Sequence, residues 1–180
     1  MLHWIGAALV SSCLGLAPTI VTAQPHEPGT VPYFLSEPLS IGVRFGGVGL
    51  QAEGSVWQVV LFRDALGGLT LDYPDLKCGG SPDIVHSTAN HLVLTERIER
   101  GLENCYSGSK VVIRTAAFGA VDIVWCGQNE SENAAAILFK DGLEKQTAKE
   151  LLDQTAARFP AKMLDELVKR ECDRSLPKSE

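Results

Sequence analysis

Between residues 39 and 139, short segments of alternating or β-branched apolar residues are separated by turns rich in glycine and proline. Such segments are typical of strands. The predicted strands are residues 39–45, 56–63, 69–73, 91–98, 110–115, 120–126 and 135–139, with turns at 46–49, 67–68, 79–82 and 118–119. Because the spacing is regular and no helix intervenes, we expect an antiparallel meander or small barrel of about 7–8 strands.

The period changes beyond Asp141, where apolar residues recur at helical spacing. Asp141 and Glu144 resemble a capping box, which predicts a helix start there, and Pro160 breaks that helix and opens a second. The apolar stripes are Ala148, Leu151, Leu152, Thr155, Ala156 and Phe159, then Met163, Leu164, Leu167, Val168 and Cys172. The pattern predicts an α+β chain, mainly β with a C-terminal helical hairpin. Charge-balanced polar faces favour packing on the β-domain over a membrane surface.

The first residues have the character of a secretory signal. Residues 2–21 are apolar, and Val21-Thr22-Ala23 offers the small residues that a signal peptidase accepts. The stretch approaches the roughly 20 residues of a transmembrane helix, but Gly15 and Pro18 interrupt it and no basic residue flanks it. The sequence favours cleavage after Ala23 over lipidation at Cys13. We therefore expect a secreted or periplasmic protein without a stable membrane span.

These patterns divide the chain into five parts. We expect a signal peptide over 1–23, a flexible N-terminal segment over 24–37 and a β-domain over 38–141. A two-helix extension over 142–174 and a disordered tail over 175–180 follow.

Charge is distributed unevenly along the chain. Its 22 acidic and 16 basic residues give a formal net charge of −6. From Glu144 onward acidic and basic residues are equal in number, so the excess of negative charge lies before that residue. Nucleic acid is not an expected partner, because its binding relies on clustered Lys and Arg. A cationic protein partner is compatible with this balance.

Four cysteines remain once the leader is removed: Cys78, Cys105, Cys126 and Cys172. An even set in an oxidising compartment predicts two disulfides, and the cysteines themselves leave three connectivities open. None has the close Cys or His neighbour that a zinc site needs. His86 and His91 are interpreted as surface residues, and we expect no metal and no cofactor.

The string Tyr73-Pro74-Asp75-Leu76-Lys77-Cys78-Gly79-Gly80 is followed by Glu96-Arg97-Ile98 and then by Gly101 and Cys105. This order resembles a pattern of uncharacterised bacterial extracytoplasmic β-domains, YP-x-L-x-CGG, E-x-I and G-x-x-x-C, over about residues 54–140. The resemblance implies a β-domain with a disulfide between Cys78 and Cys105, and no particular activity. Cys126 is then left for Cys172, which lies on the packing face of the second predicted helix.

Glu96 is the candidate polar site of the β-domain. In an extended strand it shares a face with Leu94 and Ile98, where a carboxylate is costly unless it is paired. The structural interpretation is a Glu that ties its strand to a turn or to an arginine such as Arg44 or Arg114. The functional interpretation is an acid of raised pKa in a barrel mouth. The structural one is favoured, because the sequence places no second acid beside it.

Motifs of catalysis and nucleotide binding are missing from the sequence. Ser107-Gly108-Ser109 lacks the setting of a nucleophile elbow, and the glycines at 46–49 lead into no helix. Trp57 and Trp125 lie inside predicted strands and are interpreted as core residues. We therefore expect an exported, non-catalytic binding module that acts on a protein partner, as an inhibitor, immunity or assembly factor. A small-ligand-binding barrel is the alternative, and a carboxylate-dependent hydrolase is a second.

Overall fold

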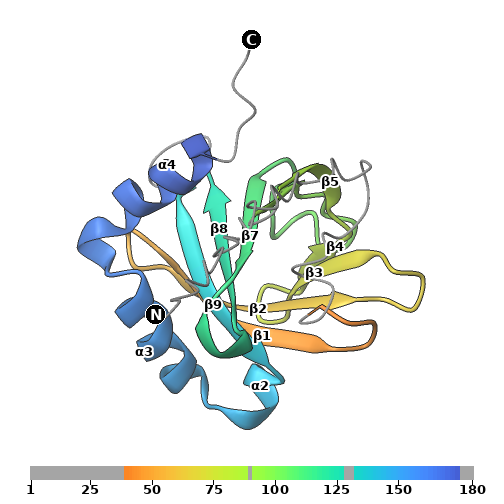
Figure 1. The fold of residues 1–180 in the computed structure, drawn as a ribbon, viewed down its shortest axis with the longest axis horizontal. Helices are drawn as coiled ribbons and strands as arrows, with labels where there is room; N and C mark the ends of the chain where they lie inside the picture. The colour runs from red at the N-terminus through yellow and green to blue at the C-terminus, as the bar shows by residue number, and fades with distance from the viewer. Residues whose placement is uncertain (1–38, 89–90, 128–131, 175–180) are drawn as a thin grey trace, which may run out of the picture.

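A computed structural model describes residues 39–88, 91–127 and 132–174 (Figure 1). These residues form one antiparallel sheet of nine strands, in the order β4-β3-β2-β1-β9-β8-β7-β6-β5, which curls into a half-barrel. The strands are β1 Arg44–Gln51, β2 Val56–Arg63, β3 Leu69–Tyr73, β4 Cys78–Gly80, β5 Asp83–Ser87, β6 Leu92–Thr95, β7 Lys110–Thr115, β8 Val121–Cys126 and β9 Ala134–Lys140. The predicted fold class is confirmed. The predicted signal peptide, N-terminal segment and C-terminal tail lie outside the described residues.

Two meanders build the sheet and meet where β1 pairs with β9. The first runs from β1 to β4 and the second from β5 to β9. Only Ser81 and Pro82 separate the two edge strands, β4 and β5, along the chain. Gly79 of β4 also forms a bridge with Arg100, which follows β6. The segment after β6 therefore lies against the far edge of the sheet.

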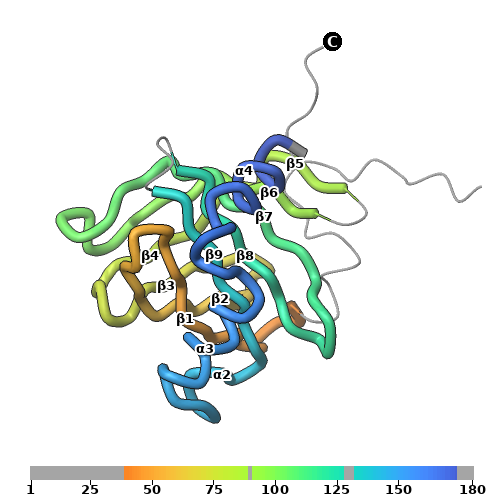
Figure 2. Tube along the Cα trace, turned by 90° about the vertical axis from the view of Figure 1, so that its left-hand side faces the viewer, coloured from red at the N-terminus to blue at the C-terminus, as the bar shows by residue number. Residues whose placement is uncertain are grey.

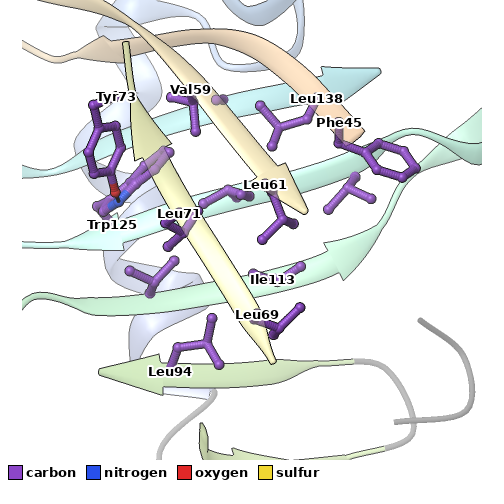
Figure 3. Close-up of a cluster of buried hydrophobic side chains, with 14 of the residues drawn as sticks. Phe45, Val59, Leu61, Leu69, Leu71, Tyr73, Leu94, Ile113, Trp125 and Leu138 are labelled. Atoms are coloured by element: carbon purple, nitrogen blue, oxygen red, sulfur yellow. Dashed lines mark hydrogen bonds between the residues drawn. The ribbon is translucent and has the colours of Figure 1, made fainter. Parts of the chain in front are cut away.

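Apolar side chains fill the inner face of the half-barrel (Figure 3). Every strand contributes to this cluster, if the partly buried Ile84 of β5 is counted. Leu61, Leu71, Ile113 and Leu138 are fully or almost fully buried. Burial of one such side chain is worth about 1.5–3 kcal/mol, so this cluster is the main source of stability.

Two helices, α3 (Ala148–Arg158) and α4 (Leu164–Arg174), cover the outer face of the central strands (Figures 1 and 2). A second apolar cluster lies between them and the sheet. Its buried members are Leu50, Val112, Val124, Ala135, Phe159, Leu164, Val168 and Cys172. The central strands are thus covered on both faces, which is why β8 and β9 lack a clean polar and apolar alternation.

A helix starts after Asp141 as predicted, but it is short and the predicted capping box does not form there. A short α2 (Gly142–Lys145) follows Asp141, whose backbone is left-handed at φ 54° and whose side chain makes no cap. The capping box forms later, where Thr147 Oγ1 accepts from Glu150 N at 3.2 Å and the Glu150 carboxylate accepts from Thr147 N at 2.8 Å. This exchange satisfies the backbone donors of Thr147 and Glu150 at the start of α3.

Pro160 separates the two helices as predicted. α3 ends at Arg158, and a 3-10 turn, η3 (Ala161–Met163), leads into α4. The apolar stripes are narrower than expected, because Ala148, Ala156 and Met163 are exposed. Only the residues nearest the sheet, such as Leu151 and Val168, are fully buried.

Strand β1 corrects the prediction of a turn at residues 46–49, which lie inside the strand. A Cβ on Gly47 would lie 2.4 Å from the backbone oxygen of Ile137, and one on Gly49 would lie 2.7 Å from the indole of Trp57. These glycines therefore allow close packing by β9 and by an aromatic ring. The strand begins at Arg44, later than the predicted 39–45.

Most other predicted strands agree with the structure. β2, β3 and β7 have the predicted bounds, β8 starts one residue later than predicted, and β9 is one residue longer at each end. β6 is shorter than the predicted 91–98, and the predicted turn at 79–82 contains the end of β4 and precedes β5 directly. Neither β4 nor β5 was predicted.

Two disulfides join Cys78 to Cys105 and Cys126 to Cys172, with Cα–Cα distances of 6.3 and 6.0 Å. The predicted pairing is confirmed. The first links β4 to the loop before β7, and the second links the end of β8 to α4. Disulfides are typical of an oxidising, extracytoplasmic environment. In the described ranges, no helix has the length and apolar character needed to cross a membrane.

Candidate functional site

A pocket of about 420 Å³ lies at one end of the half-barrel, a size typical of ligand sites. We call this the pocket end: β1, β3, β6 and β8 finish there, and β2, β7 and β9 begin there. The lining residues are Gln51, Trp57, Tyr73, Leu76, Glu96, Asn104, Cys105, Tyr106, Ser107, Ser109, Trp125, Glu132 and Ala134.

A chain of hydrogen bonds connects three of the lining side chains. Trp125 Nε1 donates to the Tyr73 hydroxyl at 3.0 Å, and that hydroxyl donates to Glu96 Oε1. Figure 3 shows the Tyr73 oxygen directed at the Trp125 indole. All three residues are buried, with at most 6% of each exposed. The chain joins β3, β8 and the end of β6, which are not neighbours in the sheet.

Burial sets the protonation behaviour of this group. Removal from water raises the pKa of Glu96 from 4.5 to about 7, although hydrogen bonds from Tyr73 and Ser109 favour the ionised form. Burial also raises the pKa of Tyr73 well above its usual value, and the charge of Glu96 adds to this rise. Near neutral pH the carboxyl therefore exists in both forms, while the phenol stays protonated as a donor.

The turn before β7 holds Glu96 in place. Glu96 N donates to the backbone oxygen of Ser109 at 2.8 Å. Ser107 Oγ accepts from Ile98 N at 2.7 Å, so the same turn also fixes the residues after Glu96. The disulfide of Cys105 anchors this loop to β4. The position of the carboxyl is thus set by backbone contacts and a covalent link.

Aromatic rings form the walls of the pocket. Trp57 and Trp125 meet edge to face, with ring centres 5.8 Å apart and planes at 72°. Both pack on the apolar interior, as predicted, but both also line the pocket. Tyr106 stands at the rim with 92% of its surface exposed. In the sequence, Tyr73 is visible only as the first residue of the YP-x-L-x-CGG string, and no pattern singles out Tyr106.

The two arginines proposed as partners of Glu96 lie elsewhere. Arg44 begins β1 at the opposite end of the half-barrel, with its guanidinium 5.2 Å from the ring centre of Phe62. Arg114 points to the outer face of the sheet, where its Nε donates to Asp122 at 3.0 Å. The expectation of an arginine partner is therefore corrected: Glu96 is held by Tyr73 and by the turn before β7.

A second cluster of charges ties the helices to the sheet. Asp122 is fully buried and accepts from Arg114 Nε and from Arg158 Nη2, the latter at 2.8 Å. Glu171 of α4 pairs with Arg114 at 2.9 Å and lies 3.6 Å from His91. His91 is thus half-buried rather than a surface residue. This network lies between α3, α4 and strands β7 and β8, and its role is structural.

Searches for related proteins do not identify the site. No protein-family model, curated protein or solved structure matches the chain. Within the residues that the structure describes, no group of three or more His, Cys, Asp or Glu is placed to hold a metal ion. The function is therefore argued from the pocket itself.

Proposed function

We propose that the protein is a non-catalytic binding module that acts outside the cytoplasm and recognises a protein partner with its pocket end. The observation that supports this proposal is a preformed pocket with an exposed apolar rim. Tyr106 is 92% exposed and Leu76 is 38% exposed, although both line the pocket. Exposed aromatic and apolar groups beside a pocket are typical of surfaces that a protein partner covers.

The filled interior favours a protein partner over the small-ligand barrel considered from the sequence. Barrels that carry small ligands enclose them among the strands. Here apolar side chains from all nine strands occupy that space, and the pocket lies at the mouth. A pocket in this position is accessible to a group that protrudes from a larger molecule.

Partner capture tests the proposal. The full chain, immobilised at low salt, should recover a protein from an envelope or secreted extract, which is then purified and its affinity measured. Tyr106→Ala should weaken binding by about tenfold or more, as loss of an interface anchor does. Phe118→Ala is the matched control, because Phe118 is an exposed aromatic residue in the turn between β7 and β8, opposite the pocket end. It should bind like the wild type.

Two results would contradict the proposal. One is the absence of any recovered protein at low salt, where charge attraction is strongest. The other is a partner whose affinity changes with Phe118→Ala and not with Tyr106→Ala, which would move the interface to the other end of the half-barrel.

One observation supports a carboxylate-dependent hydrolase as a second candidate. Glu132 lines the same pocket as Glu96, so the structure supplies a second acid that the sequence could not place. An acid with a pKa near neutrality can donate a proton to a leaving group. The Tyr73 hydroxyl and the turn before β7 already engage the Glu96 carboxyl, however, which favours a positioning role.

Hydrolysis is tested directly with dye-labelled polysaccharides and peptides. Under the binding proposal, release of dye by the wild type equals the blank. Turnover that falls about a hundredfold in Glu96→Gln, with folding retained, would instead establish hydrolysis.

A further inference from the structure

The ionisable groups that line the pocket are carboxyls and phenols. Glu96 and Glu132 supply the carboxyls and Tyr73 and Tyr106 supply the phenols, and among the residues that the structure describes the lining contains no Lys, Arg or His. Residues 39–143, the part of the chain that contains the sheet, also carry more acidic than basic side chains. A pocket with this lining attracts a cation.

The walls suit a cation on an apolar stem. The indoles of Trp57 and Trp125 and the side chain of Leu76 offer apolar surface in the same pocket as Glu96. Methylene groups pack on such surface, and an ammonium beside an indole gains a cation–π attraction of about 0.5–2 kcal/mol.

The contacts of Glu96 distinguish between the two basic side chains. A guanidinium binds a carboxylate best as a planar fork that uses both oxygens. In Glu96, the Tyr73 hydroxyl already donates to Oε1, and Ser109 also donates to the carboxyl. An ammonium is compact and rotates its three donors toward separate acceptors. The acceptors that line the pocket are the carboxyls of Glu96 and Glu132 and the amide oxygens of Gln51 and Asn104.

We infer that the pocket binds a primary ammonium on an aliphatic stem, presented by a lysine side chain of the partner. This inference rests on the proposed function, since it names the group of the partner that enters the pocket.

Capped pentapeptides that carry a central lysine, norleucine or arginine test the inference. The full chain is used with Trp4→Phe, so that both remaining tryptophans, Trp57 and Trp125, line the pocket and report binding by fluorescence. The titrations are done at low salt, which limits the screening of charges, and at about pH 8, where the Glu96 carboxyl is ionised. The lysine peptide should saturate the signal, with the norleucine and arginine peptides at least about tenfold weaker.

Two charge-matched variants complete the design. Glu96→Gln should weaken the lysine peptide by about tenfold or more, and Glu144→Gln, on exposed α2 outside the pocket, should leave its affinity unchanged. If Glu96→Gln does not fold, Glu132→Gln is the test, with a weaker affinity expected for the same reason.

Equal binding of lysine and norleucine peptides would overturn the inference, and so would equal or tighter binding of arginine. Failure of the lysine peptide to bind would overturn it too. The proposed function is judged separately: if Tyr106→Ala still weakens binding of the captured partner, the pocket end remains the interface and only the lysine inference is overturned.

Discussion

Glu96 is an acid enclosed by apolar side chains and held by hydroxyl donors. Leu94 and Ile98 beside it are buried, and its own side chain is 6% exposed. Tyr73 and Ser109 hydrogen-bond its carboxyl, yet burial dominates and raises the pKa to about 7. A folded protein that keeps a carboxyl in such a place gains rigidity in the pocket and gives up stability whenever the group ionises.

The raised pKa of Glu96 predicts that the free energy of unfolding falls as pH rises from 4.5 to about 7. The unfolded chain releases the proton of Glu96 near pH 4.5 and the folded chain near pH 7, so in between the unfolded state holds fewer protons and rising pH favours it. Between these two pH values the free energy of unfolding falls by up to about 3 kcal/mol. Urea unfolding of the wild type and of Glu96→Gln measures the effect, which the variant should lack.

Glu144→Gln provides the control for this experiment. Its exposed carboxyl changes the net charge equally, and its stability should follow the wild-type curve. If the wild type and Glu96→Gln lose stability in parallel between about pH 5 and about pH 8, the carboxyl is not held as described.

The sequence identified Glu96 but not its partner. A carboxylate in phase with Leu94 and Ile98 is visible as a break in an apolar pattern. Tyr73, by contrast, lies at the end of β3, which is separated from β6 by five strands of the sheet. Their contact depends on how far the sheet curls, and no residue spacing within one strand records that curvature.

At the level of elements, prediction succeeded where side chains determine the structure. β2 and β7 are rich in β-branched residues and are bounded by turns, and both have the predicted bounds. Prediction failed at the glycines of β1, because glycine occurs both in turns and at positions where other groups pack closely on a strand. Gly47 and Gly49 lie inside β1 because neighbouring groups approach the backbone, not because the chain turns.

The predictions missed the short edge strands β4 and β5 and the cap of α3 for a related reason. β4 is Cys78–Gly80, whose glycines carry no side-chain pattern, and its pairing with β3 and the bridge to Arg100 are long-range contacts. Asp141 with Glu144 and Thr147 with Glu150 have the same spacing, and only the second pair makes both hydrogen bonds of a capping box. Local spacing alone does not choose between the two pairs.

At the scale of the whole molecule, three kinds of contact attach the helical tail, which is the pair of helices α3 and α4, to the half-barrel. Phe159, Leu164 and Val168 pack on the outer face of the sheet. Asp122 receives guanidinium donors from β7 and α3. The disulfide of Cys126 with Cys172 adds a covalent link over a sequence separation of 46 residues. The tail is thus an integral part of the core rather than an appended segment.

Removal of the covalent link should weaken the molecule without releasing the tail. In Cys126→Ser/Cys172→Ser the unfolded chain gains freedom, and the free energy of unfolding should fall by about 2–4 kcal/mol. Because the apolar cluster and the Asp122 network remain, unfolding should stay a single transition. Urea denaturation, monitored by far-ultraviolet circular dichroism and by tryptophan fluorescence, measures it. Divergence of the two signals, with helix lost before the tryptophan environment, would show that the disulfide alone holds the tail in place.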